Sequence, residues 1–511
     1  MHDDAPHQTS AEISRRRFLQ FSGIGIGALG LIGLSGCGIF TSREQFSTFG
    51  QVDFTNPLQV PPLADSTVEN GVRTFDLVTQ SGRSAIVPAG ESDTWGINGT
   101  LLGPTIRASR GEEVAMRVRN ELDEPTTMHW HGMRVPAEAD GTPHQMIQPG
   151  ATWLPPSWII DQPAATLWYH PHPHGETERH VYQGLSGLFI LDDDAESGLD
   201  LPREYGVDDI PVIVQDKSFD EQGQLVETER QDNGMLGDTI LVNGTVGPVL
   251  DVTAERTRLR LLNGSTARSY SFGFSDDRHF DMIASDGGLL AGRVALTRIM
   301  LSPGERAEIV VELVAGESTV LRSFPHDLGV TDRLAESTGA QDELEIMQLV
   351  GAPELRHSPM VPDKLGELPT MDASDAESTR TFALGNNRIN GERMDMERID
   401  FAVPAQSVEI WEVINEHTQP HNFHVHDVQF QVLDIDGQAP PPELAGWKDT
   451  VYTPPGVPYR LIMRFGKHTN PDVPYMYHCH LLWHEDQGMM GQFVVVEPGQ
   501  EPGSIDGDHD H

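Results

Sequence analysis

The sequence has few basic residues. It contains 77 aspartates and glutamates but only 35 lysines and arginines, which gives a formal net charge of -42. Nucleic acids and anionic lipid headgroups would both be repelled by a chain of this charge, so we expect neither as a partner. The acidity fits the surface of an exported protein, including one adapted to salt, and it fits simple solubility equally well.

Cysteine is also scarce, because the chain contains only Cys37 and Cys479. An exported protein could join two cysteines in a disulfide. We do not expect this bond, because each cysteine lies inside a motif that gives it another role.

The N-terminal segment has the features of an export signal. Residues 14–20 include three consecutive arginines and resemble a twin-arginine signal, and residues 21–34 form a glycine-rich apolar stretch. That stretch is about half the length needed to span a bilayer. Residues 34–37, Leu-Ser-Gly-Cys, resemble a lipobox. We therefore expect residues 1–37 to direct export, with Cys37 lipidated on the outer face of the membrane. The alternative is an ordinary cleaved signal and a free protein in the periplasm or medium.

The remaining chain predicts several all-β domains. A chain of 511 residues is too long for one hydrophobic core. Short runs in which apolar and polar residues alternate, such as 113–118 and 407–414, are separated by Gly, Pro, Asn and Asp, which is typical of antiparallel sandwiches.

A longer repeat divides the chain into three units. Each unit opens with Asn-Gly and closes with a further Asn after an alternating run, and the openers are 145 and 147 residues apart. The openers are Asn98, Asn243 and Asn390, and the closing residues are Asn120, Asn263 and Asn415. We expect sandwich domains at 70–205, 206–365 and 366–500, after an extension at 38–69 and before a disordered acidic, histidine-containing tail at 501–511.

Paired histidines occur at matched places in the first and third units. Nine and eleven residues after the closing Asn stand His129 and His131, Phe272 and Phe274, and His424 and His426. A step of two residues along a strand puts both side chains on one face. The middle unit presents phenyl rings where the others present imidazoles, so we expect it to bind no metal.

Two further pairs, 170/172 and 478/480, end the same two units, and the latter encloses Cys479. Together with His421, His484 and Met489, this cysteine completes two histidines, a thiolate and a weak axial methionine, which is the ligand set of a blue electron-transfer copper. Zinc is the rival metal, but it would leave eight further histidines unexplained. The first unit has Pro171 and Thr126 in place of Cys479 and His421, so the blue site is expected once.

These motifs resemble those of multicopper oxidases, and most closely those of bacterial laccases and cuprous oxidases. The segments His129–Gly132, His170–His172, His421–His426 and His478–Met489 carry the resemblance, together with Gly446–Thr450. It implies three consecutive cupredoxin-like Greek-key β-sandwich domains and four coppers per chain. It also implies that electrons from a reducing substrate convert O2 to water.

The resemblance also assigns the copper ligands by position. It gives the type 1 copper to His421, Cys479, His484 and Met489, the type 2 copper to His129 and His424, and the type 3 pair to His131, His170 and His478 on one side and His172, His426 and His480 on the other. His174 has no ligand role in the family, and we expect it to lie behind the ligands or at the surface.

Two acids match residues that the family uses as proton donors. Asp140 follows His131 by nine residues, and Glu485 follows His484 directly. Oxygen reduction consumes protons, and burial could raise the pKa of a carboxyl towards working pH. The plainer interpretation is that each is one more acid of an acidic protein.

The reducing substrate is predicted from what the chain lacks. Residues 379–390 contain no methionine, and His417 and Gln419 stand where cuprous oxidases have an acid and a methionine. Phenols and aromatic amines are therefore favoured as small substrates beside O2, with Cu(I), Fe(II) or Mn(II) as the alternative. A copper-free cell-envelope scaffold and a copper-storage protein are remoter alternatives. We expect a monomer.

Overall fold

The computed structural model describes residues 45–505, apart from 228–229 and 231–232. The predicted signal, Cys37 and the histidines of the tail lie outside these residues. Within the described part of the chain, no helix has the length and apolar character needed to cross a membrane.

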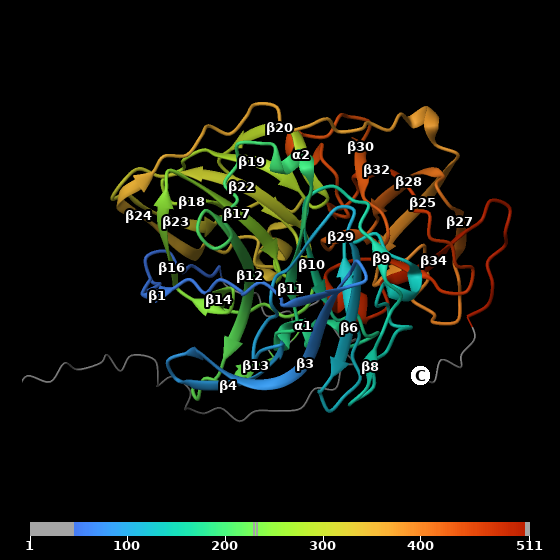
Figure 1. The fold of residues 1–511 in the computed structure, drawn as a ribbon, viewed down its shortest axis with the longest axis horizontal. Helices are drawn as coiled ribbons and strands as arrows, with labels where there is room; N and C mark the ends of the chain where they lie inside the picture. Colours follow the sequence, from blue (N-terminus) through green and yellow to red (C-terminus); the bar gives the residue numbers. More distant parts are fainter. Residues whose placement is uncertain (1–44, 228–229, 231–232, 506–511) are drawn as a thin grey trace, which may run out of the picture. The chain divides into compact units, whose positions relative to one another are not determined.

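The described chain is built of β-sheets, as the alternating runs predict, and can be followed by colour in Figure 1. In the first domain one sheet contains β2 (Ser66–Glu69), β3 (Val72–Val87), β4 (Gly90–Ile97), β6 (Glu113–Asn120), β8 (Thr152–Trp153) and β9 (Trp158–Ile159), and the other β5 (Ile106–Ser109), β7 (His129–His131), β10 (Ala165–His170) and β11 (Gly187–Asp192).

The middle domain, green and yellow in Figure 1, has the same two-sheet plan. One sheet contains β12 (Asp209–Phe219), β13 (Leu225–Val226), β14 (Thr239–Val242), β15 (Thr245–Val246), β17 (Arg256–Asn263), β19 (Phe280–Ser285), β20 (Gly288–Leu296) and β22 (Arg306–Glu312), and the other β1 (Asn56–Pro57), β16 (Pro248–Ala254), β18 (Tyr270–Phe274), β21 (Ile299–Leu301), β23 (Ser318–Ser323) and β24 (Leu344–Arg356).

The third domain, orange and red in Figure 1, repeats the plan again. One sheet contains β25 (Ser378–Gly385), β26 (Arg388–Ile389), β28 (Val408–Asn415), β30 (Phe430–Ile435) and β32 (Pro458–Arg464), and the other β27 (Phe401–Pro404), β29 (His421–Val425), β31 (Thr450–Thr453), β33 (Tyr475–His478) and β34 (Met490–Val496).

Helices are short and few among the described residues. They are α1 (Thr177–Gln183), α2 (Asp194–Ser197), α3 (Asp332–Ser337) and α4 (Leu482–Asp486), with 3-10 turns at Ala137–Ala139, Ala373–Asp375 and Pro442–Leu444. The all-β, three-sandwich fold predicted from the sequence is confirmed. Strands β1 and β2 come from the predicted extension at 38–69, and the exact domain boundaries stay a prediction.

The three Asn-Gly openers have one structural role. Asn98, Asn243 and Asn390 all adopt positive φ, between 51° and 55°, a region that asparagine tolerates in turns. In each, the side-chain oxygen accepts a hydrogen bond from a backbone N–H of the neighbouring strand. The donors are Val78 to Asn98 at 2.7 Å, Ile213 to Asn243 at 2.9 Å and Ala383 to Asn390 at 2.8 Å. The sequence repeat therefore records a repeated turn.

The closing asparagines are also equivalent. All three are fully buried at strand ends: Asn120, Asn263 and Asn415. The side-chain oxygen of each accepts a hydrogen bond from the backbone N–H two residues later, and its amino group donates to two backbone carbonyls. Buried backbone groups need such partners. Each asparagine thus fixes the chain that leads into the next strand, where the histidine or phenylalanine pair lies.

Strand register confirms the alignment of the three units. The pairs that lie directly opposite each other are His129 and His170, Phe272 and Ser323, and His424 and His478. Phe272 therefore occupies the position of His129 and His424. Phe272 and Phe274 are fully buried in the core of the middle domain, so apolar packing replaces the imidazoles there.

Candidate metal centres

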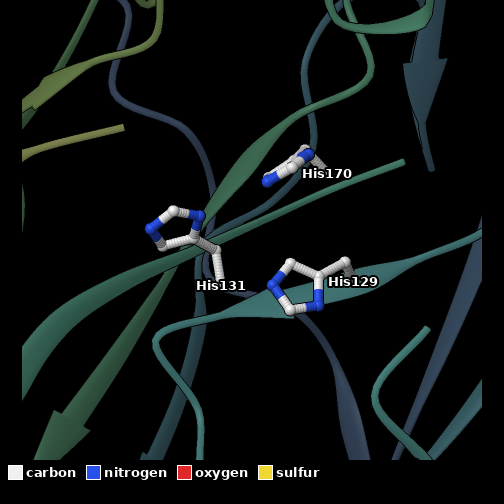
Figure 2. Close-up of side chains that lie close together, drawn as sticks. All are labelled: His129, His131 and His170. Atoms are coloured by element: carbon white, nitrogen blue, oxygen red, sulfur yellow. The ribbon is translucent and has the colours of Figure 1, made fainter. Parts of the chain in front are cut away.

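The first domain contributes four buried imidazoles to one place. His129 and His131 lie on β7, His170 ends the adjacent strand β10, and His172 follows it. Figure 2 shows the rings of His129, His131 and His170 close together, and each offers one nitrogen within 4.8 Å of the others. The ring of His129 is fixed because its Nδ1 donates to the carbonyl oxygen of Asp140 at 2.7 Å.

The third domain contributes four more imidazoles in the equivalent way. His424 and His426 lie on and just after β29, while His478 ends β33 and is followed by His480. The Nδ1 of His424 donates to the carbonyl oxygen of Asp449 at 2.8 Å. This hydrogen bond repeats the one between His129 and Asp140.

The two sets of four meet between the first and third domains. The ring of His129 stacks on that of His426 with centroids 3.9 Å apart, and the Nε2 atoms of His172 and His426 each lie 3.2 Å from Nε2 of His478. The prediction that the four histidine pairs meet at this interface is confirmed. Eight buried imidazoles share one space.

The grouping of two histidines differs from the one expected. His478 lies with His172 and His426, whereas the ring of His480 is 4.8 Å from His131 and 5.3 Å from His170. The sequence-based assignment had exchanged His478 and His480 and was wrong on this point. Strand β33 ends at His478, so strand alternation does not determine where the ring of His480 points.

Nitrogens of the cluster fit a metal. Nε2 of His129, His170 and His424 and Nδ1 of His131 are buried and have no hydrogen-bond partner within the described part of the chain. A buried polar atom without a partner is costly. Burial lowers the pKa of His172 and His480 to about 3, so these rings are neutral and keep the lone pairs that a metal needs.

A second cluster surrounds Cys479. Nδ1 of His421 and Nδ1 of His484 are 3.0 Å apart, and each is 3.6 Å from Sγ of the cysteine. Met489 is buried in the same core, and its carbonyl oxygen accepts a hydrogen bond from the backbone N–H of Cys479 at 3.1 Å. Burial raises the pKa of the Cys479 thiol to about 12, so a bound cation is needed to keep it as thiolate.

The two clusters are joined by three consecutive residues. His478 and His480 belong to the eight-imidazole cluster, and Cys479 between them belongs to the sulfur cluster. Sulfur and imidazole donors of this kind suit copper.

Comparison with known proteins agrees with this arrangement. Models of the multicopper oxidase family match residues 80–196 and 361–499. A multicopper oxidase of Staphylococcus haemolyticus is 37% identical over 446 residues, which are 86% of this chain and 93% of that protein. The chain belongs to the multicopper oxidase family. It also resembles the cell division protein FtsP of Dickeya dadantii, with 35% identity over 491 residues covering 94% of this chain and 98% of that protein. The crystal structure of a laccase from Pediococcus acidilactici superposes with a TM-score of 0.79 and 34% identity, covering 90% of this chain and 96% of that one.

The two predicted acids touch the imidazole cluster. Oδ2 of Asp140 lies 2.7 Å from Nδ1 of His426. The carboxylate of Glu485 lies between two rings, with Oε1 3.3 Å from Nδ1 of His172 and Oε2 3.1 Å from Nδ1 of His478. Both acids are buried against rings of the cluster, so they differ from the other acids of this acidic protein.

The pKa of Glu485 differs from the expected direction. Burial alone would raise it, but His172 and His478 hold the pKa of this carboxyl well below its usual range. The expectation of a raised pKa is therefore wrong for Glu485. Its position between two rings, rather than its burial, determines the behaviour of this carboxyl.

Sequence reasoning missed the role of Asp449. Its Oδ1 lies 3.0 Å from Nε2 of His131, and its carbonyl oxygen holds His424. Asp449 is thus the third-domain counterpart of Asp140, which binds one histidine by its carbonyl and another by its carboxylate. The position of Asp449 within the Gly446–Thr450 motif was the available signal.

Two other features lie outside the clusters. His174 is exposed in the turn that follows His172 and precedes α1, in agreement with its lack of a ligand role. Met394 and Met396 are half-buried in a loop, and the amide of Met394 donates to the carbonyl of Gly488 at 2.9 Å. This loop therefore lies beside Gly488, which directly precedes Met489.

Proposed function

We propose that this chain is an exported, laccase-like oxidase that couples four one-electron oxidations of a small reducing substrate to the reduction of O2 to water. The supporting observation is the pair of donor clusters joined through His478, Cys479 and His480. A single electron carrier beside a larger metal cluster is the arrangement that such a coupled reaction needs.

The donor sets divide among four coppers per chain. His421, Cys479, His484 and Met489 would hold the type 1 copper, His129 and His424 the type 2 copper, and His131, His170 and His480 the first and His172, His426 and His478 the second of the type 3 pair. With copper bound, the sulfur site would supply one-electron transfer and the imidazole cluster would supply the reduction of O2.

The protein's own contribution is connection, burial and proton supply. The side chains of Cys479 and His478 are linked by one peptide unit, which provides a short covalent path between the clusters. Complete burial of the imidazoles keeps bulk water from the cluster. The carboxylates of Glu485 and Asp140, in contact with ligand rings, are placed to accept and relay the protons that oxygen reduction consumes.

Phenols and aromatic amines are the favoured substrates. The chain has no methionines in residues 379–390, and His417 and Gln419 precede His421, so a dedicated site for Cu(I) is not evident in the motif. The alternative is oxidation of metal ions. It is favoured by the loop of Met394 and Met396, which lies next to Gly488.

Export by the twin-arginine route, with Cys37 as a lipid anchor on the outer face of the membrane, is part of the proposal and rests on residues 14–37. One acyl chain gives only weak anchoring. Labelling with a radioactive fatty acid, with Cys37→Ala as the control, tests the anchor.

A cell-envelope scaffold without copper is the competing function, suggested by the resemblance to the cell division protein FtsP. A scaffold does not need buried nitrogens without partners, and these are present here at His129, His131 and His170. The complete donor set therefore favours the oxidase.

Copper loading followed by oxygen-consumption measurements distinguishes these functions. We expect about four coppers per chain, an intense blue colour and oxygen uptake that is fastest with phenols. His174→Ala is the matched control, because this exposed histidine belongs to neither cluster. Uptake with Fe(II), Mn(II) or Cu(I) alone would support the metal-ion alternative, and a chain that binds no copper would support the scaffold.

A further inference from the structure

Arg306, the first residue of β22 in the middle domain, connects all three domains. Its guanidinium is completely buried and donates all five of its N–H bonds. Nε donates to the carbonyl of Thr166 in the first domain at 3.0 Å. Nη1 and Nη2 donate to the carbonyls of Gly304 and Asp286 in its own domain, each at 3.0 Å, and to Oδ1 and Oδ2 of Asp449 in the third domain at 2.7 and 2.6 Å. Bidentate pairing of this kind fixes both charged groups in orientation as well as in distance.

The carboxylate that Arg306 holds also contacts a ligand of the imidazole cluster. Oδ1 of Asp449 accepts from Nε2 of His131 at 3.0 Å, and Thr450 Oγ1 lies 3.2 Å from the same nitrogen. With Nε2 carrying the proton, Nδ1 of His131 is left without a partner within the described residues. It is therefore the atom that His131 presents to a metal.

The orientation of His131 is opposite to that of its neighbours. His129, His424 and His426 each use Nδ1 for a protein hydrogen bond, to Asp140 or Asp449. Those three rings present Nε2 to the cluster. An acceptor on the far side of the His131 ring is needed to hold it in the reversed orientation. The carboxylate of Asp449 supplies the shorter contact, and Thr450 Oγ1 supplies a second one.

The residue after His131 leaves room for the ion pair. A Cβ atom at Gly132 would lie 2.5 Å from Oδ2 of Asp449 and 2.8 Å from Nη2 of Arg306, and Gly132 has a φ of +84°. Both the space and the backbone conformation therefore require glycine. In the motif His129–Gly132, the histidines are candidate metal ligands and the glycine leaves room for the ion pair of Arg306 and Asp449.

We propose that Arg306 and Asp449 are positioning residues of the imidazole cluster, and that the middle domain supplies Arg306 to select the His131 tautomer that binds metal through Nδ1. The inference rests on the proposed function, because it requires these histidines to bind copper. It gives the middle domain a direct part in a site to which it contributes no ligand. A buried carboxylate without its arginine would be poorly stabilised, and Asp449 would no longer be held against His131.

Arg306→Lys is the principal variant, because lysine keeps the charge but cannot bind both oxygens of Asp449. The control is Arg268→Lys, which alters another fully buried arginine of the middle domain that pairs with Asp216 and Asp342. The measurements are copper per chain after dialysis against a chelator, the electron paramagnetic resonance signal of the histidine-bound copper, and the blue colour of the Cys479 site. Loss of an outer partner of a ligand typically weakens metal binding by about 10- to 100-fold.

We expect Arg306→Lys to lose histidine-bound copper about 10- to 100-fold more readily than the wild type while it keeps its blue colour. Arg268→Lys should retain all of its copper. Wild-type retention and an unchanged resonance signal in Arg306→Lys would overturn the inference, as would equal loss in the control. If Arg306→Lys does not fold, Thr450→Val removes a hydroxyl that donates to Asp449 and contacts His131 and His424. This variant should show a smaller loss in the same direction, and no loss there would overturn the inference. Failure of the wild type to bind copper would instead refute the proposed function.

Discussion

The imidazole of His131, from the first domain, is stacked on that of His424, from the third, with ring centroids 3.8 Å apart and planes 10° from parallel. His129, also from the first domain, stacks in the same way on His426 from the third. Each domain thus supplies one ring to each stack, and neither domain alone contains the cluster.

Cys479→Ser should abolish the blue colour and the oxidase activity and leave the fold nearly intact. The thiolate gives the colour and begins the short path to His478 and His480, and a serine hydroxyl is a hard ligand that is rarely ionised. Copper content should fall by about one of four, because the imidazole cluster remains. Visible absorption, metal analysis and oxygen uptake check this. Full turnover by the variant would mean that electrons enter by another path.

Glu485→Gln should slow oxygen reduction by about 10- to 100-fold while the type 1 site is still reduced by substrate at the normal rate. Glutamine keeps the shape between His172 and His478 but cannot accept a proton. Stopped-flow recording separates bleaching of the blue colour by substrate from its return with O2. Glu121→Gln, at an exposed acid of the first domain, is the control. Equal rates of colour return in wild type and variant would remove Glu485 from the mechanism.

Phe274→Ala should destabilise the middle domain without changing copper content. Phe274 is completely buried and contacts Phe280 with ring centroids 6.0 Å apart. Truncation of such a ring leaves a cavity and typically costs about 3–5 kcal/mol. Denaturant unfolding and metal analysis of the same samples check both parts. Copper loss in the folded variant would show that this position does more than pack the core.

Glu308→Gln should lower stability at neutral pH and lose that effect in acid. Burial would raise the pKa of this carboxyl, but Arg258 and Arg260 lower it to about 2. Because the folded pKa lies below the unfolded value near 4.5, the carboxylate stabilises the fold above about pH 4.5 and loses its contribution as the pH falls towards 2. The pKa difference corresponds to about 3 kcal/mol.

Denaturant unfolding of wild type and Glu308→Gln between pH 2 and 7 measures the difference. Glu312→Gln, at an exposed glutamate on the same strand, is the control. A gap between wild type and Glu308→Gln that stays constant down to pH 2 would contradict the assignment.

The sequence alone was sufficient for the features that depend on local spacing. Asn98, Asn243 and Asn390 revealed the threefold repeat, because each must form the same turn and turns of this kind restrict residue type. The placed pairs, such as His129 and His131, identified the ligand residues, because strand alternation puts both on one face.

Tertiary structure decided what depends on residues far apart in the chain. The partners of His480 follow from how β33 ends and how two domains meet, which no local pattern contains. The contact of Arg306 with Asp449 joins residues 143 positions apart in different domains. The sequence does not distinguish an arginine that stabilises a core from one that orients a metal ligand. Only the packed domains show that this one reaches His131 through Asp449, because the direction of a hydrogen bond is set by three-dimensional placement and not by residue type.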